Sequence, residues 1–269
     1  MSGAGVIGRD AISNAIRAAA AKGDPALVAF LTAGYPKKEK FREHLQAVAA
    51  GADVVEIGVP FTDPMADGVT IQRSSHAAIA QGVSLRWILA ELEAMPRLKT
   101  PLLLMSYLNP LLAFGTGKLA AAAAKAGVSG FIVPDLPLDE SAELRASLDE
   151  YQLALVQMVT PVTKPERLAA LCASSQGFVY AVTMTGTTGK NVAIPTEVVN
   201  YLDRARELAS VPVCAGFGIR TREQVELLRG HVDGVVVGSA LVEVLERGED
   251  ATEWLRKLRK SPPGGAPHG

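Results

Sequence analysis

The stretch Val54-Val55-Glu56-Ile57-Gly58 is a short apolar run with a single carboxylate at its centre. Runs of this kind, rich in β-branched residues, are typical of parallel strands that are buried on both faces. Seven similar runs recur at regular spacing, over residues 26–32, 101–107, 130–135, 153–160, 178–183, 211–216 and 234–239. The sequence therefore predicts eight buried parallel strands.

The segments between these runs have the apolar spacing of amphipathic helices, most clearly over residues 85–95, 165–172 and 222–228. A further helix over residues 10–22 precedes the first strand and opens like a capped helix. Eight strands, each followed by a helix, predict an α/β fold of the (β/α)₈ TIM-barrel type with an extra N-terminal helix. A doubly wound sheet would show a glycine-rich fingerprint where Gly34-Tyr35-Pro36 stands.

The composition excludes several classes of protein. The chain has 269 residues, and its 27 Lys and Arg against 28 Asp and Glu leave a net charge of −1. A nucleic-acid binder would instead carry an excess of positive charge. Hydrophobic residues make up 48%, but no apolar run is long enough to span a membrane and no signal peptide is visible. We expect a cytoplasmic protein with a single domain over residues 1–260 and a disordered tail over residues 261–269.

The alternation of side chains along a strand places Glu56 inside the predicted barrel. Val54, Glu56 and Gly58 share one face, and the opposite face carries only Val55 and Ile57, which should meet the helices. Active sites of this fold lie at the C-terminal ends of the strands. Burial there raises the pKa of a carboxyl group towards neutrality, as acid–base catalysis requires. A structural Glu, paired with a buried Arg or with backbone groups, is the alternative interpretation.

Two more carboxylates, Asp63 and Asp67, lie in the loop over residues 59–69 that follows this strand. Taken alone, each belongs to an ordinary turn signal, Asp-Pro or Asp-Gly. Buried and solvated acids placed side by side differ in pKa and can divide acid–base work between them. Binding of Mg²⁺ is the other interpretation that the residues leave open.

Glycines follow the seventh and eighth strands, in Gly216-Phe217-Gly218-Ile219 and Gly238-Ser239-Ala240. Glycine lets the backbone approach an anion, and helix N-termini at these two places form the phosphate site of many TIM barrels. The pattern favours phosphate binding over tight turns alone. Residues 184–194 (MTGTTGKNVAI) follow the sixth strand and are interpreted as a lid over the site, the alternative being a surface loop without a role.

Other kinds of catalytic site find less support in the sequence. The four histidines do not have the spacing of metal ligands, and we expect no metal site. No lysine falls within the predicted strands, which argues against a Schiff-base aldolase.

These residues resemble the tryptophan synthase alpha subunit family in its bacterial form, over about residues 26–239. The longest matching element is EIGVPFTDPMADG at residues 56–68, which resembles the family signature around its two catalytic acids. Supporting matches are LTAGYP at 31–36, MSYLNP at 105–110, VPDLP at 133–137, TGTTG at 185–189 and the two glycine motifs described above.

The resemblance implies retro-aldol cleavage of indole-3-glycerol phosphate to indole and glyceraldehyde 3-phosphate in tryptophan biosynthesis. It implies that Glu56 is the general acid/base and that Asp67 accepts the indole N–H. It implies no metal and no cofactor in this chain, and a β subunit that carries pyridoxal phosphate and receives the indole within an α₂β₂ heterotetramer. The remaining positions that match are Phe30, Tyr107 and Tyr180 around indole, Gly189, Gly218, Gly238 and Ser239 at phosphate, Thr188 in the lid, and Asp63 and Asp135 near the partner.

Three alternatives differ from this interpretation in function. The first is a stand-alone lyase that releases indole without a β subunit. The second is a weakly active barrel that binds and activates a partner, although the presence of Glu56 and Asp67 argues against it. The third is another phosphate-binding isomerase barrel, which would lack the signature at residues 56–68.

Overall fold

Each strand pairs in parallel with the next one along the chain, and β8 pairs with β1 to close a barrel. The computed structural model describes residues 8–183, 194–216 and 218–259. The strands are β1 (Ala26–Thr32), β2 (Val54–Gly58), β3 (Leu102–Met105), β4 (Val128–Ile132), β5 (Ala154–Val159), β6 (Val179–Val182), β7 (Val213–Gly216) and β8 (Gly234–Val237).

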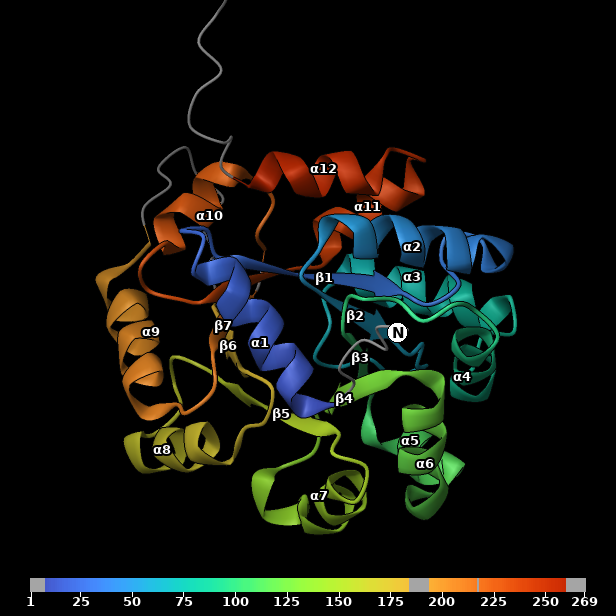
Figure 1. The fold of residues 1–269 in the computed structure, drawn as a ribbon, viewed down its shortest axis with the longest axis horizontal. Coiled ribbons are helices and arrows are strands. Elements are labelled where there is room, and N and C mark those ends of the chain that lie inside the picture. Colours follow the sequence, from blue (N-terminus) through green and yellow to red (C-terminus); the bar gives the residue numbers. More distant parts are fainter. Residues whose placement is uncertain (1–7, 184–193, 217, 260–269) are drawn as a thin grey trace, which may run out of the picture.

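Helices surround this barrel, as Figure 1 shows, and one further helix precedes β1. The predicted (β/α)₈ fold with an extra N-terminal helix is therefore confirmed. The helices are α1 (Arg9–Ala20), α2 (Phe41–Gly51), α3 (Val69–Ala80), α4 (Leu85–Glu93), α5 (Leu108–Phe114), α6 (Thr116–Ala126), α7 (Ala142–Asp149), α8 (Pro165–Ser174), α9 (Thr196–Leu208), α10 (Arg222–Leu228), α11 (Ser239–Glu246) and α12 (Ala251–Leu258), with 3₁₀ turns at Lys38–Lys40 and Leu138–Glu140.

Several element boundaries differ slightly from the sequence prediction, and two differences at helix ends have a physical cause. Strand β4 begins before the expected range of 130–135, because Gly127 ends α6 at a φ of 83° and Val128 follows directly as strand. The expected side-chain cap of the first helix is wrong. Its N-cap is Gly8, which makes no side-chain cap hydrogen bond, and the N–H of Arg9 instead donates to the carbonyl of Gln152 at 2.8 Å.

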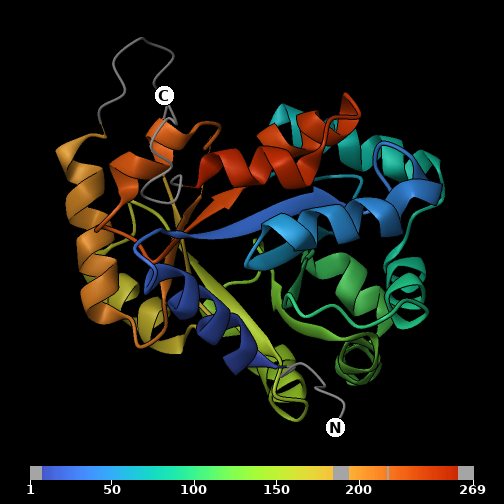
Figure 2. The same ribbon diagram turned by 45° about the horizontal axis from the view of Figure 1, so that its top comes forward.

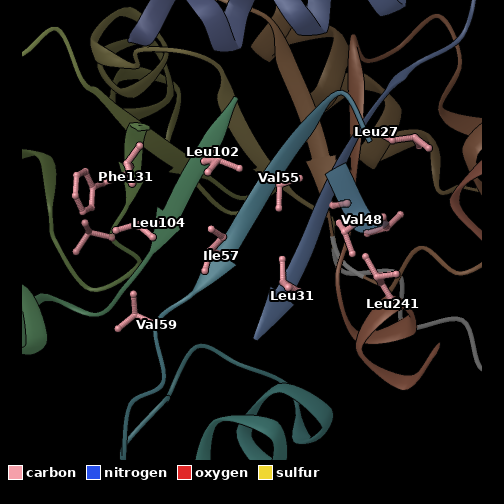
Figure 3. Close-up of a cluster of buried hydrophobic side chains, with 14 of the residues drawn as sticks. Leu27, Leu31, Val48, Val55, Ile57, Val59, Leu102, Leu104, Phe131 and Leu241 are labelled. Atoms are coloured by element: carbon pink, nitrogen blue, oxygen red, sulfur yellow. The ribbon is translucent and has the colours of Figure 1, made fainter. Parts of the chain in front are cut away.

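Apolar side chains fill two layers of the molecule. Alternate residues such as Val54 and Leu103 fill the barrel interior, whereas Val55 and Ile57 lie in the layer between strands and helices. Figure 3 shows Val55 and Ile57 on β2 within this outer layer. Each fully buried aliphatic side chain contributes about 1.5–3 kcal/mol. Because the outer face of β2 is entirely apolar, Glu56 on the same strand faces inward.

Helix α1 lies at the N-terminal end of the barrel, where it packs against the interior (Figure 2). Ile12 and Ile16 are fully buried in the same cluster as the interior side chains Val54 and Phe178. The hydroxyl of Ser13 donates to the carbonyl of Gly177 at 2.6 Å. The helix therefore closes the end of the barrel opposite to the C-terminal ends of the strands.

Some predictions concern residues that the structure does not describe. The lid over 184–194 lies outside the described residues except for Ile194, and the tail over 261–269 lies wholly outside them. The single domain over 1–260 stays a prediction. Among the described residues, no helix is both long and apolar enough to cross a membrane.

Candidate active site

Glu56 lies inside the barrel, in register with Phe30 on β1 and Leu103 on β3. Its side chain is only 2% exposed, and its Oε2 atom is buried with no hydrogen-bond partner among the described residues. Burial, and then the nearby charge of Asp67, raise the pKa of Glu56 from its ordinary 4.5 to about 8. The carboxyl group is therefore mostly protonated near neutral pH.

Asp67 lies in the loop between β2 and α3, and this loop is held from two sides. The hydroxyl of Tyr107 donates to Oδ2 of Asp67 at 3.1 Å and accepts the N–H of Ala66 at 2.9 Å. The amide of Gln72 donates to the carbonyl of Asp67 at 2.9 Å. Burial raises the pKa of Asp67 to about 6, and the Tyr107 hydrogen bond opposes that rise. At neutral pH, Asp67 is therefore mostly an anion beside a protonated Glu56.

Two glycines leave room for the aromatic rings of the site. A Cβ at Gly58 would lie 2.5 Å from Cζ of Phe30, and a Cβ at Gly216 would lie 2.6 Å from the hydroxyl of Tyr180. Real Cβ atoms do not make contacts this short, so a side chain at either position would displace the ring. The structure thus places Phe30 and Tyr180 at the inner face of the barrel near its C-terminal end.

A small pocket opens beside Asp67 at this end of the barrel. The rings of Phe61 and Tyr107 stack within it, with centroids 5.1 Å apart. Ser75 on α3 fixes Phe61, because its hydroxyl accepts the N–H of Phe61 at 2.8 Å and donates to the carbonyl at 3.0 Å. The sequence analysis did not predict several residues that line this pocket, among them Phe61, Ile71, Ser75 and Met105. The adjacent serines Ser74 and Ser75 on α3 were a signal that could have pointed to Ser75.

The candidate phosphate residues lie at the ends of adjacent strands. Strands β7 and β8 pair with Gly216 opposite Val236. Gly218 then adopts a φ of 77°, which favours glycine, and Gly238 is the N-cap of α11, where Ser239 is the first helical residue. The first N–H groups of a helix have no acceptor within it, so they are available to an anion. Thr188 and Gly189 lie outside the described residues.

The two remaining predicted residues are exposed and lie outside the buried pair. Asp63 accepts the hydroxyl of Thr62 at 2.5 Å, and Asp135 accepts the N–H of Leu108 at 2.8 Å at the start of α5. Within the described part of the chain, no three His, Cys, Asp or Glu side chains lie close enough together to hold a metal ion. The Mg²⁺ alternative, which needs Asp63 beside Glu56 and Asp67, finds no such cluster here.

Known proteins resemble this chain over most of its length. The family model described as tryptophan synthase alpha chain matches residues 16–262. The tryptophan synthase alpha chain of Nitratidesulfovibrio vulgaris strain Hildenborough is 47% identical over 243 residues, which cover 90% of this chain and 95% of that protein. That of Carboxydothermus hydrogenoformans is 42% identical over 227 residues, covering 84% and 85% of the two chains.

Solved structures show the same similarity. A tryptophan synthase chain from M. tuberculosis, in an open form, superposes with a TM-score of 0.84 at 33% identity, covering 94% of this chain and 98% of that one. The tryptophan synthase subunit alpha of Legionella pneumophila strain Paris gives a TM-score of 0.81 at 29% identity, covering 94% and 96% of the chains. Sequence and fold therefore point to one family.

Proposed function

The chain belongs to the tryptophan synthase alpha chain family, and from this premise we propose that Glu56 and Asp67 cleave indole-3-glycerol phosphate to indole and glyceraldehyde 3-phosphate. The enzyme is a carbon–carbon lyase of tryptophan biosynthesis. The other isomerase barrels considered above are not supported, because the matched family covers residues 16–262.

The chemistry needs one proton donor and one fixed anion. Protonated Glu56 delivers its proton to C3 of the indole ring, and the resulting cation is stabilised by the Asp67 carboxylate at the ring N–H. The Glu56 carboxylate then removes the proton of the glycerol hydroxyl next to C3. The carbon–carbon bond breaks, its electrons return to the ring, an aldehyde forms, and Glu56 is protonated again.

The observation that carries this proposal is the buried Oε2 of Glu56 without a partner among the described residues, beside an Asp67 that ionises at lower pH. A structural glutamate would be paired, because a buried polar group without a hydrogen bond is unfavourable. Two acids with separated pKa values are what acid–base work at neutral pH requires.

The remaining site residues bind the two ends of the substrate in this proposal. Phe30, Tyr107 and Tyr180 surround the indole ring. Backbone N–H groups at the start of α11 and in the β7 loop bind the phosphate, and Thr188 closes the lid. The phosphate-binding residues are Gly189, Gly218, Gly238 and Ser239.

Exposed apolar side chains around the barrel mouth support a protein partner at this face. Met65 and Val69 are 91% and 80% exposed after β2, Leu112 is 52% exposed on α5, and Val162 is 90% exposed after β5. Large apolar side chains gathered at one end of a protein favour an interface. We assign this face to a tryptophan synthase β subunit, with Asp63 and Asp135 near the contact.

In this assembly, two α and two β subunits form a heterotetramer in the cytoplasm. Pyridoxal phosphate resides in the β subunit, which receives indole from this chain. The cleavage step itself is carried out by side chains of this chain without a cofactor.

The test is the rate of indole release from indole-3-glycerol phosphate, with and without an added tryptophan synthase β subunit. We expect slow release that accelerates strongly when β is added. Fast release without β would instead identify a stand-alone lyase. No release under either condition would leave a binding and activating subunit.

A further inference from the structure

Glu243 on α11 is contacted from two other segments of the catalytic end. The guanidinium of Arg220 donates two hydrogen bonds to its carboxylate, from Nη1 to Oε2 at 2.8 Å and from Nη2 to Oε1 at 2.9 Å. The hydroxyl of Thr70 donates to Oε1 at 3.3 Å. A two-pronged pair of this kind fixes orientation as well as distance.

The two partners of Glu243 come from segments next to the candidate site. Thr70 lies in the first turn of α3, shortly after Asp67 in the sequence. Arg220 follows Gly218 in the loop after β7, and Glu243 lies about one turn beyond Ser239 on α11. One carboxylate therefore joins the helix behind Asp67 to the segments of the candidate phosphate site that follow β7 and β8.

A second contact holds the same two helices together. Arg73 on α3 pairs with Glu246 on α11 at 2.5 Å. Beside it, Val242 of α11 packs in a cluster with Phe30, against which Ile71 of α3 is also packed. Polar and apolar contacts therefore join α3 to α11.

We propose that Glu243 is a positioning residue that couples occupancy of the phosphate site to the placement of Asp67 against the indole ring. The inference rests on the proposed function, because it deepens the roles of Gly218, Ser239 and Asp67. The Arg220–Glu243 pair is partly exposed, at 48% and 26% of the two side chains, and such pairs contribute little to stability. The contact therefore acts on geometry rather than on folding.

The proposal can be tested without turnover, by measuring how inorganic phosphate changes the affinity for indole. The Kd of indole is measured with and without saturating inorganic phosphate, and the ratio of the two values reports the coupling between the sites. In the native chain we expect phosphate to tighten indole binding by about fivefold or more. Thr70→Val should remove most of this ratio while leaving the Kd of phosphate within about twofold, because the Arg220–Glu243 pair is kept. Glu243→Gln should also lower the ratio, and should weaken phosphate binding as well.

Two further variants separate positioning from general damage. Thr70→Ser keeps the hydroxyl and should restore the coupling. Arg204→Gln removes a comparable exposed pair, Arg204–Glu207 at 2.7 Å on α9, and should change nothing. In turnover, Thr70→Val should lower kcat for indole-3-glycerol phosphate by about three- to tenfold at nearly unchanged KM.

Three results would overturn the proposal: no coupling in the native chain, full coupling in Thr70→Val, or loss of coupling in Thr70→Ser equal to that in Thr70→Val. Failure of the proposed function is recognised separately. It would appear as an absence of indole release by the native chain with and without β, whatever the binding ratio is.

Discussion

Glu56 and Asp67 are neighbouring carboxyl groups with separated pKa values: burial, and then the charge of Asp67, raise the pKa of Glu56 to about 8, whereas that of Asp67 is about 6. The difference follows from their surroundings. Glu56 is fully enclosed in the barrel, whereas Asp67 is less deeply buried and accepts the hydroxyl of Tyr107. Between these two values the pair holds one proton, and that proton resides mainly on Glu56.

Replacement of the proton donor should abolish cleavage. We expect Glu56→Gln to keep the fold and the affinity for inorganic phosphate but to lower indole release by about 10²–10⁴-fold, because an amide cannot transfer a proton. Steady-state release of indole from indole-3-glycerol phosphate measures this, with Arg204→Gln at an exposed position of α9 as a control. Unchanged turnover would remove Glu56 from the reaction.

Replacement of the anion should affect chemistry more than binding. We expect Asp67→Asn to lower kcat by about 10²–10³-fold, because the cation formed at the indole ring loses its counter-charge. Phosphate binding, measured as the Kd of inorganic phosphate, should stay close to that of the parent. If phosphate binding fell by the same factor as kcat, Asp67 would have a structural role in its loop.

The pH dependence of kcat/KM should be bell-shaped. Asp67 must lose its proton and Glu56 must keep one, so the acidic limb should lie near pH 6 and the alkaline limb near pH 8. In Tyr107→Phe the Asp67 anion loses a hydrogen bond, so the pKa of Asp67 should rise and the acidic limb should move to higher pH. An acidic limb that moves to lower pH, or does not move, would contradict this assignment.

The raised pKa of Glu56 should also make the free energy of unfolding depend on pH. Folded Glu56 keeps its proton up to about pH 8, whereas the unfolded group loses it near 4.5, so the folded state binds more protons between these values. Stability should therefore fall as pH rises from about 4.5 to 8 and level off above that range. Relative to the parent, Glu56→Gln should gain about 3–5 kcal/mol between pH 4.5 and pH 9 in urea unfolding. An equal difference between the two proteins at both pH values would refute the raised pKa.

The space at Gly58 should be essential to the aromatic pocket. A Cβ there would meet the ring of Phe30 at 2.5 Å, so Gly58→Ala should destabilise the chain by about 1–3 kcal/mol and raise KM for the substrate. Gly117→Ala is a matched control, since its Cβ would meet no atom within 4 Å. Equal effects of the two substitutions would show that the ring is not the cause.

The sequence predicts the barrel and the inward direction of Glu56 because both follow from local rules: strand spacing and two-residue alternation. It could not predict which groups meet across loops. The hydrogen bond between Tyr107 and Asp67, the contact of Ser75 with Phe61 and the pairing of Thr70 with Glu243 join positions that only the closed barrel brings together. The early start of β4 was missed because Gly127 allows strand to follow helix without a loop.

Within the described part of the chain, α1 closes the N-terminal end of the barrel. Ile12 and Ile16 fill that end, so under the proposed function substrate and products would pass through the opposite end, which Met65 and Val69 border. A subunit that covers this mouth controls departure as well as arrival. In the proposed assembly, indole released beneath that subunit would pass into the covering protein rather than into bulk water.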